Sequence, residues 1–378
     1  MVAELTADQR SLRELTRKFL ARRADEPVVR AAMETPAGFD EGVWREFAEL
    51  GLCGLAVPAR YGGANCGPAE VAIVMRELGR ALAPLPFFSS VALAQTVVLQ
   101  SDDAAASDRL LPDLATGRRR AAVGLVEPSW RWDPTTVRTA ATEHDGGQWR
   151  LSGTKTFVVD GTTADVILLA ARHSTGVGLF EVEAGAPGMS RTALTTIDQT
   201  RRVARIDMTE TPARQVGASN AAIDVLDRAL PLAYIYLAAE SVGGTECVLT
   251  RAVDYARTRT QFGRPIGSFQ AIKHKCADMH VDYETARSTL EHAVSSAAGA
   301  ADDAATSASI AAAFCHHAFL RCAAENIQVH GGIGFTWEHH AHLYYKRAQA
   351  NSVLLGDDAH HRRFLAISLG LAEPQPSR

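Results

Sequence analysis

Apolar residues recur at helical spacing through the first third of the chain. Leu12, Leu15 and Phe19 are three or four residues apart, and the stretch 68–84, PAEVAIVMRELGRALAP, repeats that period. Such spacing places the apolar side chains on one face of a helix. The pattern predicts a helical N-terminal domain over residues 1–118.

After residue 118 the pattern changes to short runs that are rich in β-branched and apolar residues. Examples are AAVGLV, QWRLSGTKTFVVDG and DVILLAAR, and turns such as HDGG and EAGAPG separate the runs. Many short strands joined by glycine-rich turns are typical of a small barrel or sandwich. We therefore expect a middle β domain over residues 119–213.

From residue 214 to the end the helical period returns. AAIDVLDRALPLAYIYLAAESVGGTECVLTRAVDYARTR is a nearly continuous helical pattern, and two alanine-rich segments follow it. Alanine favours helix and lets neighbouring helices approach closely, as in a bundle. The pattern predicts a helical bundle over residues 214–378, and the whole chain is expected to be an α+β protein of three domains.

Composition and charge narrow the function. The 378 residues are 47% apolar and 22% charged, and the formal net charge is −4. A basic stripe is missing, so nucleic-acid binding is not expected. Charges interrupt every long apolar run, so no segment of about 20 residues is expected to cross a bilayer. The N-terminal stretch also lacks the apolar core of a signal peptide.

Cysteine and histidine usage indicates neither disulfides nor a metal centre. None of the six cysteines stands in a Cys-x-x-Cys pair, so we expect reduced thiols in a cytoplasmic protein. Adjacent pairs such as His316-His317 and His360-His361 point to different faces of a helix. We therefore expect no metal site.

Two motifs carry candidate chemistry. In YARTRTQFGRPIGSFQ, residues 255–270, Arg257, Arg259 and Arg264 surround a turn at the end of a helix. Guanidinium groups suit a pyrophosphate, although cations at a helix end also stabilise the helix dipole without any ligand. In ENIQVHGGIGF an amide and a glycine pair allow close contact with an anion, although such a pair is also a common helix C-cap.

Together the two motifs are more specific, and the chain resembles the acyl-CoA dehydrogenase family. The matching pieces are RTRTQFGRPIGSFQAIKHKCADM, QVHGGIGFTWEHHAHLYYKRA and the turn LAVPARYGG. The resemblance covers essentially the whole chain. It implies an N-terminal helical domain, a middle β-barrel and a C-terminal four-helix bundle. It also implies an FAD enzyme that desaturates acyl-CoA thioesters between the α and β carbons.

The resemblance also assigns cofactor-binding residues. Arg259 is implied to bind the FAD pyrophosphate, and Gln270 to lie near the adenosine half. In this family these motifs reach across a dimer interface to the FAD of the neighbouring subunit. The other implied cofactor-binding positions are Phe262, Gln328, Gly331 and Gly332.

The other half of the family's site is altered. Where the family carries a Gly-Ala-Gly-Ser-type loop after a Glu-Pro pair, this chain reads VEPSWRWDPTT, with Trp130 and Trp132 in place of small residues. Where the family places a threonine near the flavin ring, this chain has Val159. The resemblance therefore predicts that this chain does not retain the cofactor by itself.

The catalytic base is missing from both positions that the family uses. One position falls on Leu355 or Gly356, and the other on Ala233. A positioned base contributes about 10²–10⁴-fold to such a reaction. Asp357 and Glu240 are the nearest substitutes, but a Gly-Asp-Asp sequence before a helix favours Asp357 as an N-cap.

These features resemble the smaller, base-lacking subunit of actinobacterial heterotetrameric acyl-CoA dehydrogenases, several of which act on steroid side chains. The implied partners are a second subunit with the catalytic glutamate, an acyl-CoA substrate and an electron-transfer flavoprotein. Two alternatives stay open: a homotetramer that uses Asp357 or Glu240 as a displaced base, and a non-enzymatic scaffold.

Overall fold

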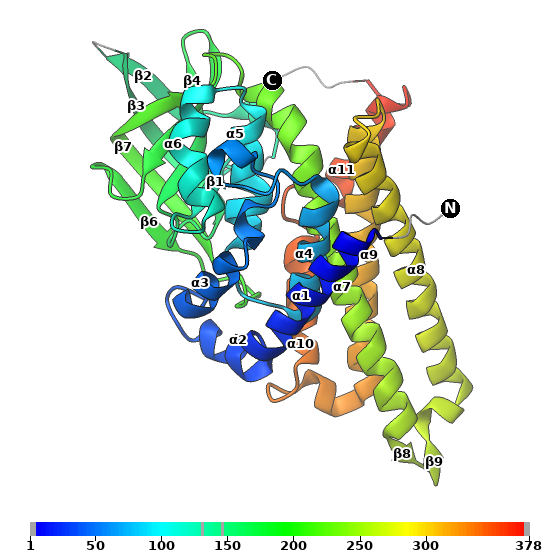
Figure 1. Ribbon diagram of the computed structural model, residues 1–378. Coiled ribbons are helices and arrows are strands. Elements are labelled where there is room, and N and C mark those ends of the chain that lie inside the picture. The colour runs from blue at the N-terminus through cyan, green and yellow to red at the C-terminus, as the bar shows by residue number, and fades with distance from the viewer. Residues whose placement is uncertain (1–4, 130–131, 145–146, 374–378) are drawn as a thin grey trace. The chain divides into compact units, whose positions relative to one another are not determined.

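The chain folds into two compact units, and Figure 1 traces their elements. The structure, a computed structural model, describes residues 5–129, 132–144 and 147–373. Within these residues, unit 1 comprises 5–31, 68–83 and 234–373, and unit 2 comprises 32–67 and 84–233.

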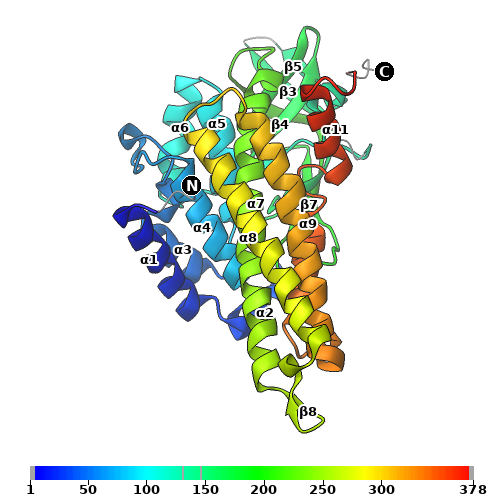
Figure 2. The ribbon, with the colours of Figure 1, turned by 90° about the vertical axis from the view of Figure 1, so that its right-hand side faces the viewer.

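Unit 1 is a helical bundle with one small hairpin. The long helices α8 and α9 run side by side, and the hairpin of β8 and β9 lies at one end of the bundle (Figure 2). The predicted C-terminal bundle is therefore confirmed. The elements with residues in this unit are α1 (Ala7–Arg23), α2 (Glu26–Met33), α4 (Pro68–Ala81), α7 (Ala222–Thr258), β8 (Thr260–Gln261), β9 (Arg264–Pro265), α8 (Gln270–Ala298), α9 (Ala304–His330), α10 (Ala341–Asn351) and α11 (Asp358–Ser368).

Two glycines allow α4 and α7 to touch backbone to backbone. A Cβ atom at Gly79 would lie 2.0 Å from the carbonyl oxygen of Glu240, and one at Gly243 would lie 1.8 Å from that of Arg76. No side chain fits at such distances, so any larger residue at either glycine would push the two helices apart.

The start of α1 is set by a capping box, and its middle is tied to α4. Thr6 Oγ1 accepts from the backbone of Gln9 at 3.2 Å, and the Gln9 side chain accepts from the backbone of Thr6 at 3.1 Å. This reciprocal pair satisfies two donors that a helix start leaves open. Further along, Arg17 donates twice to the fully buried carboxylate of Glu77, each time at 2.8 Å.

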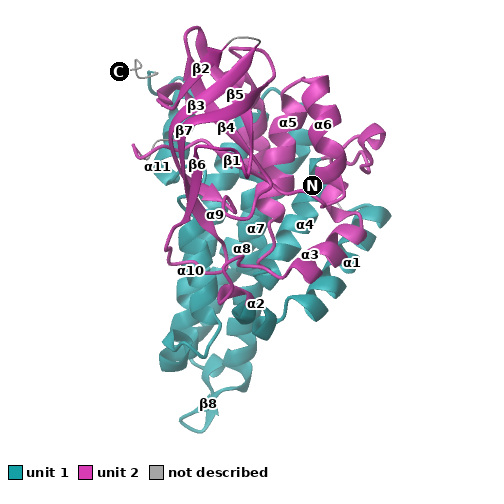
Figure 3. Ribbon diagram, turned by 90° about the vertical axis from the view of Figure 1, so that its left-hand side faces the viewer, with its two compact units in different colours: residues 1–31, 68–83, 234–373 teal, residues 32–67, 84–233, 374–378 magenta. Residues whose placement is uncertain are grey.

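Unit 2, magenta in Figure 3, holds a closed β sheet and short helices. The strands are ordered β1-β4-β2-β3-β7-β5, and a second pairing between β4 and β5 closes the sheet into a small barrel. The strands are β1 (Ala121–Gly124), β2 (Ala140–His144), β3 (Gln148–Val159), β4 (Val166–His173), β5 (Gly176–Glu183), β6 (Met189–Ala193) and β7 (Val203–Val216).

The barrel interior is filled by apolar side chains from several strands. Leu151, Ile167, Phe180 and Ile206 are each fully buried in one cluster. Alternate residues of a strand face the same side, so the apolar runs of the sequence become the inner wall. β6 was not predicted, because its sequence MSRTA is polar and exposed and it pairs only with β7.

The remaining helices of unit 2 are short. The segment SSVALAQ, within the predicted N-terminal helical domain, belongs to a π-helix over Phe88–Gln95, where every residue is buried. The other helices are α3 (Glu41–Glu49), α5 (Thr96–Gln100) and α6 (Ala104–Ala115).

Candidate functional site

The two cofactor motifs come together at one end of the bundle in unit 1. Tyr255 on α7 and His330 on α9 stack with their ring centroids 4.3 Å apart and an angle of 26° between the planes. α7 ends at Thr258 and α9 at His330. Arg259 and Gly331 therefore follow two neighbouring helix ends, although they are 72 positions apart in the sequence.

Arg259 begins an exposed hairpin. Its carbonyl accepts from the backbone of Ile266 at 2.8 Å, which closes the hairpin at its base. The Arg259 side chain is exposed, and in the described parts of the chain no carboxylate lies within 4.0 Å of its guanidinium. The charge is therefore available to an anion from outside the chain.

The hairpin tip presents aromatic surface. Phe262 has a φ of +54° and is 91% exposed. Its ring meets Phe269 edge-on at 6.1 Å, and the guanidinium of Arg264 lies 4.2 Å from the Phe269 ring centre. The hairpin tip therefore exposes one large apolar ring close to the cation of Arg264.

The glycine loop, Gly331 and Gly332, is exposed. Gly331 has a φ of +67° and its N–H caps α9, so the C-cap interpretation of this glycine is correct. A Cβ atom at Gly331 or Gly332 would meet nothing within 4 Å. Gln328, one turn earlier, and Gln270, at the start of α8, are both exposed. The loop therefore has room for a ligand against its backbone.

The residues at the two positions where the resemblance predicts a base carry no ionisable group. Ala233 is fully buried on α7, and Leu355 is 2% exposed with a φ of +63°. That backbone conformation is costly for a branched residue, so the surrounding packing holds Leu355 in place. Gly356 has a φ of +117°, and a Cβ there would lie 2.5 Å from the ring of His360.

Glu240 is engaged inside the bundle. Arg347 Nη1 donates to its Oε1 at 2.7 Å, and Asn351 Nδ2 donates to its Oε2 at 2.9 Å. Glu240 is 4% exposed and Arg347 is 2% exposed. A carboxylate held in this way by a cation and an amide is a poor proton acceptor.

Asp357 caps α11 as the sequence predicted. Its Oδ1 accepts from the backbone of His360 at 2.8 Å, and its own backbone is extended. This bond satisfies an N–H at the helix start. It gives Asp357 a structural role in this chain.

Sequence reasoning missed a buried ion pair in the barrel. Lys155 Nζ donates to Glu127 Oε1 at 2.8 Å, and Glu127 also accepts from Arg138 N, Thr139 N and Thr139 Oγ1. Burial lowers the pKa of Lys155 to about 8. Burial acts to raise the pKa of Glu127, but Lys155 and the other donors bring it below the usual range. Glu127 therefore ties residue 127 to residues 138 and 139.

The altered positions of the barrel are close to this pair in sequence. Val159 is 4% exposed and offers only methyl groups. Phe157 has a φ of +54°, next to a break in the register between β3 and β7. Trp132 is half-buried, whereas Trp130 lies outside the described residues.

Two further findings concern sites of other kinds. Among residues 5–129, 132–144 and 147–373, no three His, Cys, Asp or Glu side chains gather as metal ligands would. No helix within these same ranges has both the length and the apolar character needed to span a membrane.

Comparison with known proteins identifies the family. Family models described as the acyl-CoA dehydrogenase N-terminal, middle and C-terminal domains match residues 6–118, 122–204 and 216–370. The chain is also 35% identical over 352 residues to acyl-CoA dehydrogenase IpdE2 of Mycobacterium tuberculosis, a match that covers 92% of this chain and 93% of the relative. The chain belongs to the acyl-CoA dehydrogenase family.

Two solved structures have the same fold. One is described as the Tcur3481-Tcur3483 steroid ACAD, with 32% identity, a TM-score of 0.88 and coverage of 96% of this chain and 98% of that chain. The other is the ChsE4-ChsE5 complex from Mycobacterium tuberculosis, with 28% identity, a TM-score of 0.89 and coverage of 99% of both chains.

Members of this family bind FAD, and the residues present here fit one half of its site. The exposed Arg259 and the open space beside Gly331 and Gly332 suit a diphosphate approached from outside the chain. The barrel side does not fit, because Val159 supplies no hydroxyl. The domain limits 1–118, 119–213 and 214–378 stay predictions.

Proposed function

We propose that this chain is the base-lacking subunit of a heteromeric acyl-CoA dehydrogenase. The observation that carries the proposal is the contrast within unit 1. Arg259, Gly331 and Gly332, which would contact the FAD of a neighbouring subunit, are exposed. Leu355, at a position where the family carries its base, is buried and cannot accept a proton.

Each residue that would contact the partner's FAD has a separate role. Arg259 donates charge-assisted hydrogen bonds to the pyrophosphate of an FAD that is seated on the partner subunit. Gly331 and Gly332 admit the cofactor to their backbone, and Gln328 supplies amide groups. Gln270 lies beside the adenosine half, and Phe262 covers the hairpin tip. When bound, FAD accepts the hydride that leaves the β-carbon of the acyl-CoA.

The partner subunit supplies the missing chemistry. Its glutamate takes the α-proton, because Ala233, Leu355 and Gly356 of this chain have no group that could do so.

The substrate we propose is a CoA thioester of a steroid side chain. The description of one neighbour as a steroid ACAD supports this choice, and the second neighbour is itself a complex of two different subunits. An electron-transfer flavoprotein as acceptor and a cytoplasmic location stay predictions.

The displaced-base alternative is less favoured by the geometry. Glu240 is committed to Arg347 and Asn351, and Asp357 is committed to the start of α11. The scaffold alternative does not account for the exposed guanidinium of Arg259 beside an open glycine loop.

Co-expression tests the proposal. The chain is purified alone and together with an acyl-CoA dehydrogenase subunit that carries the glutamate and the Gly-Ala-Gly-Ser-type loop. Flavin absorbance per chain is then measured for both preparations. We expect a nearly colourless chain alone and a yellow, active complex. A homomer of this chain with one FAD per subunit would overturn the proposal.

A further inference from the structure

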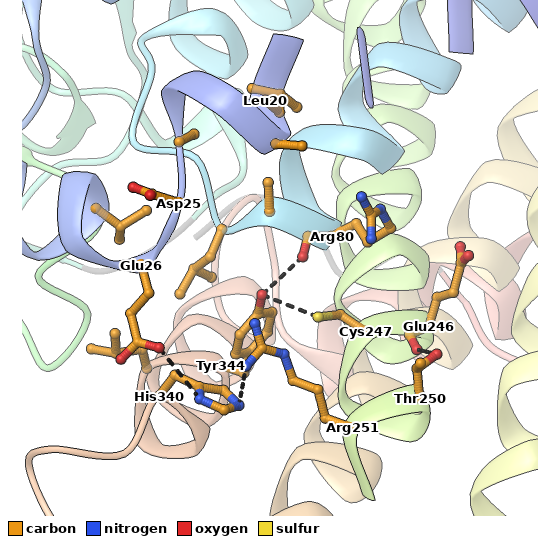
Figure 4. Close-up of a pocket in the computed structure, with 16 residues that line it drawn as sticks. Leu20, Asp25, Glu26, Arg80, Glu246, Cys247, Thr250, Arg251, His340 and Tyr344 are labelled. Carbon is orange, nitrogen blue, oxygen red and sulfur yellow. Dashed lines mark hydrogen bonds and ion pairs between the residues drawn. The ribbon is translucent and has the colours of Figure 1, made fainter. Parts of the chain in front are cut away.

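Unit 1 contains a second possible ligand site, a cleft of about 330 Å³. α1, α4, α7 and α10 supply most of its wall, and residues from the start of α2 complete it (Figure 4). Cavities that bind small molecules begin at about this size. Leu20, Val29 and Leu343 give the cleft an apolar side.

Arg251 brings an unneutralised charge to this cleft. Its Nη1 donates to His340 Nε2, and its guanidinium lies 5.8 Å from the centre of the Tyr344 ring. Among the residues that the structure describes, no carboxylate lies within 4.0 Å of this guanidinium. Arg251 is partly buried, which acts to lower the pKa of its guanidinium, but Cys247, Tyr344 and Glu26 bring that pKa above its ordinary value. The cation therefore stays charged in the cleft.

The nearest carboxylates of the cleft are held by other cations. Glu26 Oε1 lies 2.9 Å from Arg30 Nη2. Glu246 Oε2 lies 2.9 Å from Arg76, and its Oε1 lies 3.6 Å from Arg17. Asp25, which also lines the cleft, accepts from the backbone of Val28 at 3.2 Å. None of these three carboxylates lies within 4.0 Å of the guanidinium of Arg251, although the charge of Glu26 contributes to raising its pKa.

His340 positions Arg251 without neutralising it. Because Nε2 accepts from Arg251, the ring proton is assigned to Nδ1, which faces Glu26 Oε2 at 3.5 Å. Figure 4 shows this line from Glu26 through His340 to Arg251. Burial and the nearby Arg251 lower the pKa of His340 to about 3, so the imidazole is uncharged at neutral pH.

The floor of the cleft has no unsatisfied hydroxyl. Tyr344 Oη donates to the carbonyl of Arg80 at 2.8 Å and accepts from Cys247 Sγ at 3.2 Å. The floor therefore offers ring and sulfur surface, which is apolar in character.

We propose that the cleft binds a small organic carboxylate with an apolar body. The carboxylate pairs with the guanidinium of Arg251, a geometry that allows two parallel hydrogen bonds. The apolar body lies against Leu20, Val29 and Leu343. Because Asp25, Glu26 and Glu246 also line the cleft, a monoanion suits it better than a phosphate dianion, which those carboxylates would repel more strongly. The cleft adjoins the cofactor motifs, because the rings of His340 and His330 lie 6.4 Å apart. None of its lining residues belongs to those motifs, and the proposal does not depend on the proposed function.

Calorimetric titration with sodium octanoate tests the proposal. The full-length chain is used in the form in which it purifies, with any partner that it carries. We expect saturable binding that Arg251→Gln weakens at least tenfold, because the substitution removes the charged half of the pair. Arg287→Gln on α8 is the matched control and should bind as the unmodified chain does. Inorganic phosphate should bind at least tenfold more weakly than octanoate.

A second variant distinguishes loss of the binding site from misfolding of the chain. Ala21 is exposed and lines the cleft, so Ala21→Trp should fill it while leaving the fold intact. This variant should also weaken octanoate binding at least tenfold at an unchanged melting temperature. The proposal is overturned by an absence of saturable binding in the unmodified chain. Undiminished binding in either cleft variant overturns it too, as does equal or tighter binding of phosphate.

Discussion

Arg347 and Glu240 form an ion pair inside the helical bundle, with Nη1 and Oε1 2.7 Å apart and side chains only 2% and 5% exposed. Removing one partner of such a pair leaves the other charge buried and uncompensated, which typically costs about 3–5 kcal/mol. Glu240→Gln should therefore lower the free energy of unfolding by about that amount. Turnover per folded complex should stay within a few-fold, because the carboxylate is structural.

Denaturant unfolding and dye-coupled turnover together check this prediction. The control is Glu14→Gln, whose carboxylate is exposed and lies 3.8 Å from Lys18. That variant should change stability by less than about 0.5 kcal/mol. A hundredfold loss of turnover in Glu240→Gln, with fold and flavin content unchanged, would identify Glu240 as a displaced base.

Two substitutions at Asp357 distinguish a helix N-cap from a catalytic base. Asn caps a helix about as well as Asp, whereas Ala loses the side-chain acceptor at a cost of about 1 kcal/mol. We expect Asp357→Asn to unfold like the unmodified chain and Asp357→Ala to be less stable by about that amount. Both variants should keep full turnover in the complex. Asp357→Asn with normal stability but a hundredfold slower turnover would refute the structural role.

Arg259→Ala should remove FAD from the complex without changing the fold. The side chain is exposed, so its loss costs this chain little stability, whereas a charge-assisted contact to pyrophosphate contributes about 1.5–3 kcal/mol. Flavin absorbance after gel filtration and the melting temperature are measured together. Arg257→Ala, an exposed cation two residues earlier, is the control and should retain the flavin. Equal flavin retention in both variants would mean that Arg259 is only a solvated charge at a helix end.

Lys155 and Glu127 should behave as one structural unit in the barrel. Lys155→Met leaves the carboxylate of Glu127 buried beside the backbone donors of Arg138 and Thr139, and we expect a loss of about 3–5 kcal/mol. The double variant Lys155→Met with Glu127→Gln should lose less than the sum of the two single variants, because neither charge is then left alone. Additive losses in denaturant unfolding would show that the two side chains act independently.

Long periodic segments made much of the fold predictable. The apolar pattern of residues 221–259 became α7, and the runs AAVGLV and DVILLAAR became β1 and β4. The first segment has a helical period, whereas the other two are short continuous apolar runs, which is how fully buried strands read in a sequence. β6 was missed because its residues are polar, and its register is set by β7 rather than by its own pattern.

The contacts that define the sites were not accessible from the sequence. Glu240 and Arg347 are 107 residues apart, and nothing in either segment indicates the pairing. The same is true of Glu127 and Lys155, and of the cleft around Arg251, whose wall comes from five separate helices. The cofactor motifs could be recognised because each is contiguous, whereas ion pairs and clefts depend on how distant segments pack.

His361 should make the fold sensitive to acid. It is 1% exposed, and its ring meets Tyr234 edge-on at 4.8 Å. Neither ring nitrogen meets hydrogen-bond geometry with a described group, although the Gly356 backbone lies near. Burial, with a contribution from His360, lowers the pKa of His361 from 6.5 to about 4. The unfolded chain therefore binds a proton more readily than the folded chain.

The sign of the effect follows from that difference. Stability from His361 is fully present above pH 6.5 and is lost as the pH falls from 6.5 towards 4. Between pH 7.5 and 5.5 the loss amounts to about 1.4 kcal/mol.

His361→Phe keeps an aromatic ring against Tyr234 and cannot take a proton, so the variant should lose about that much less stability over the same range. The control His317→Phe alters an exposed ring on α9 and should leave the pH dependence unchanged. Urea unfolding at the two pH values decides the question, and an equal acid loss in His361→Phe and the unmodified chain would show that other groups carry it.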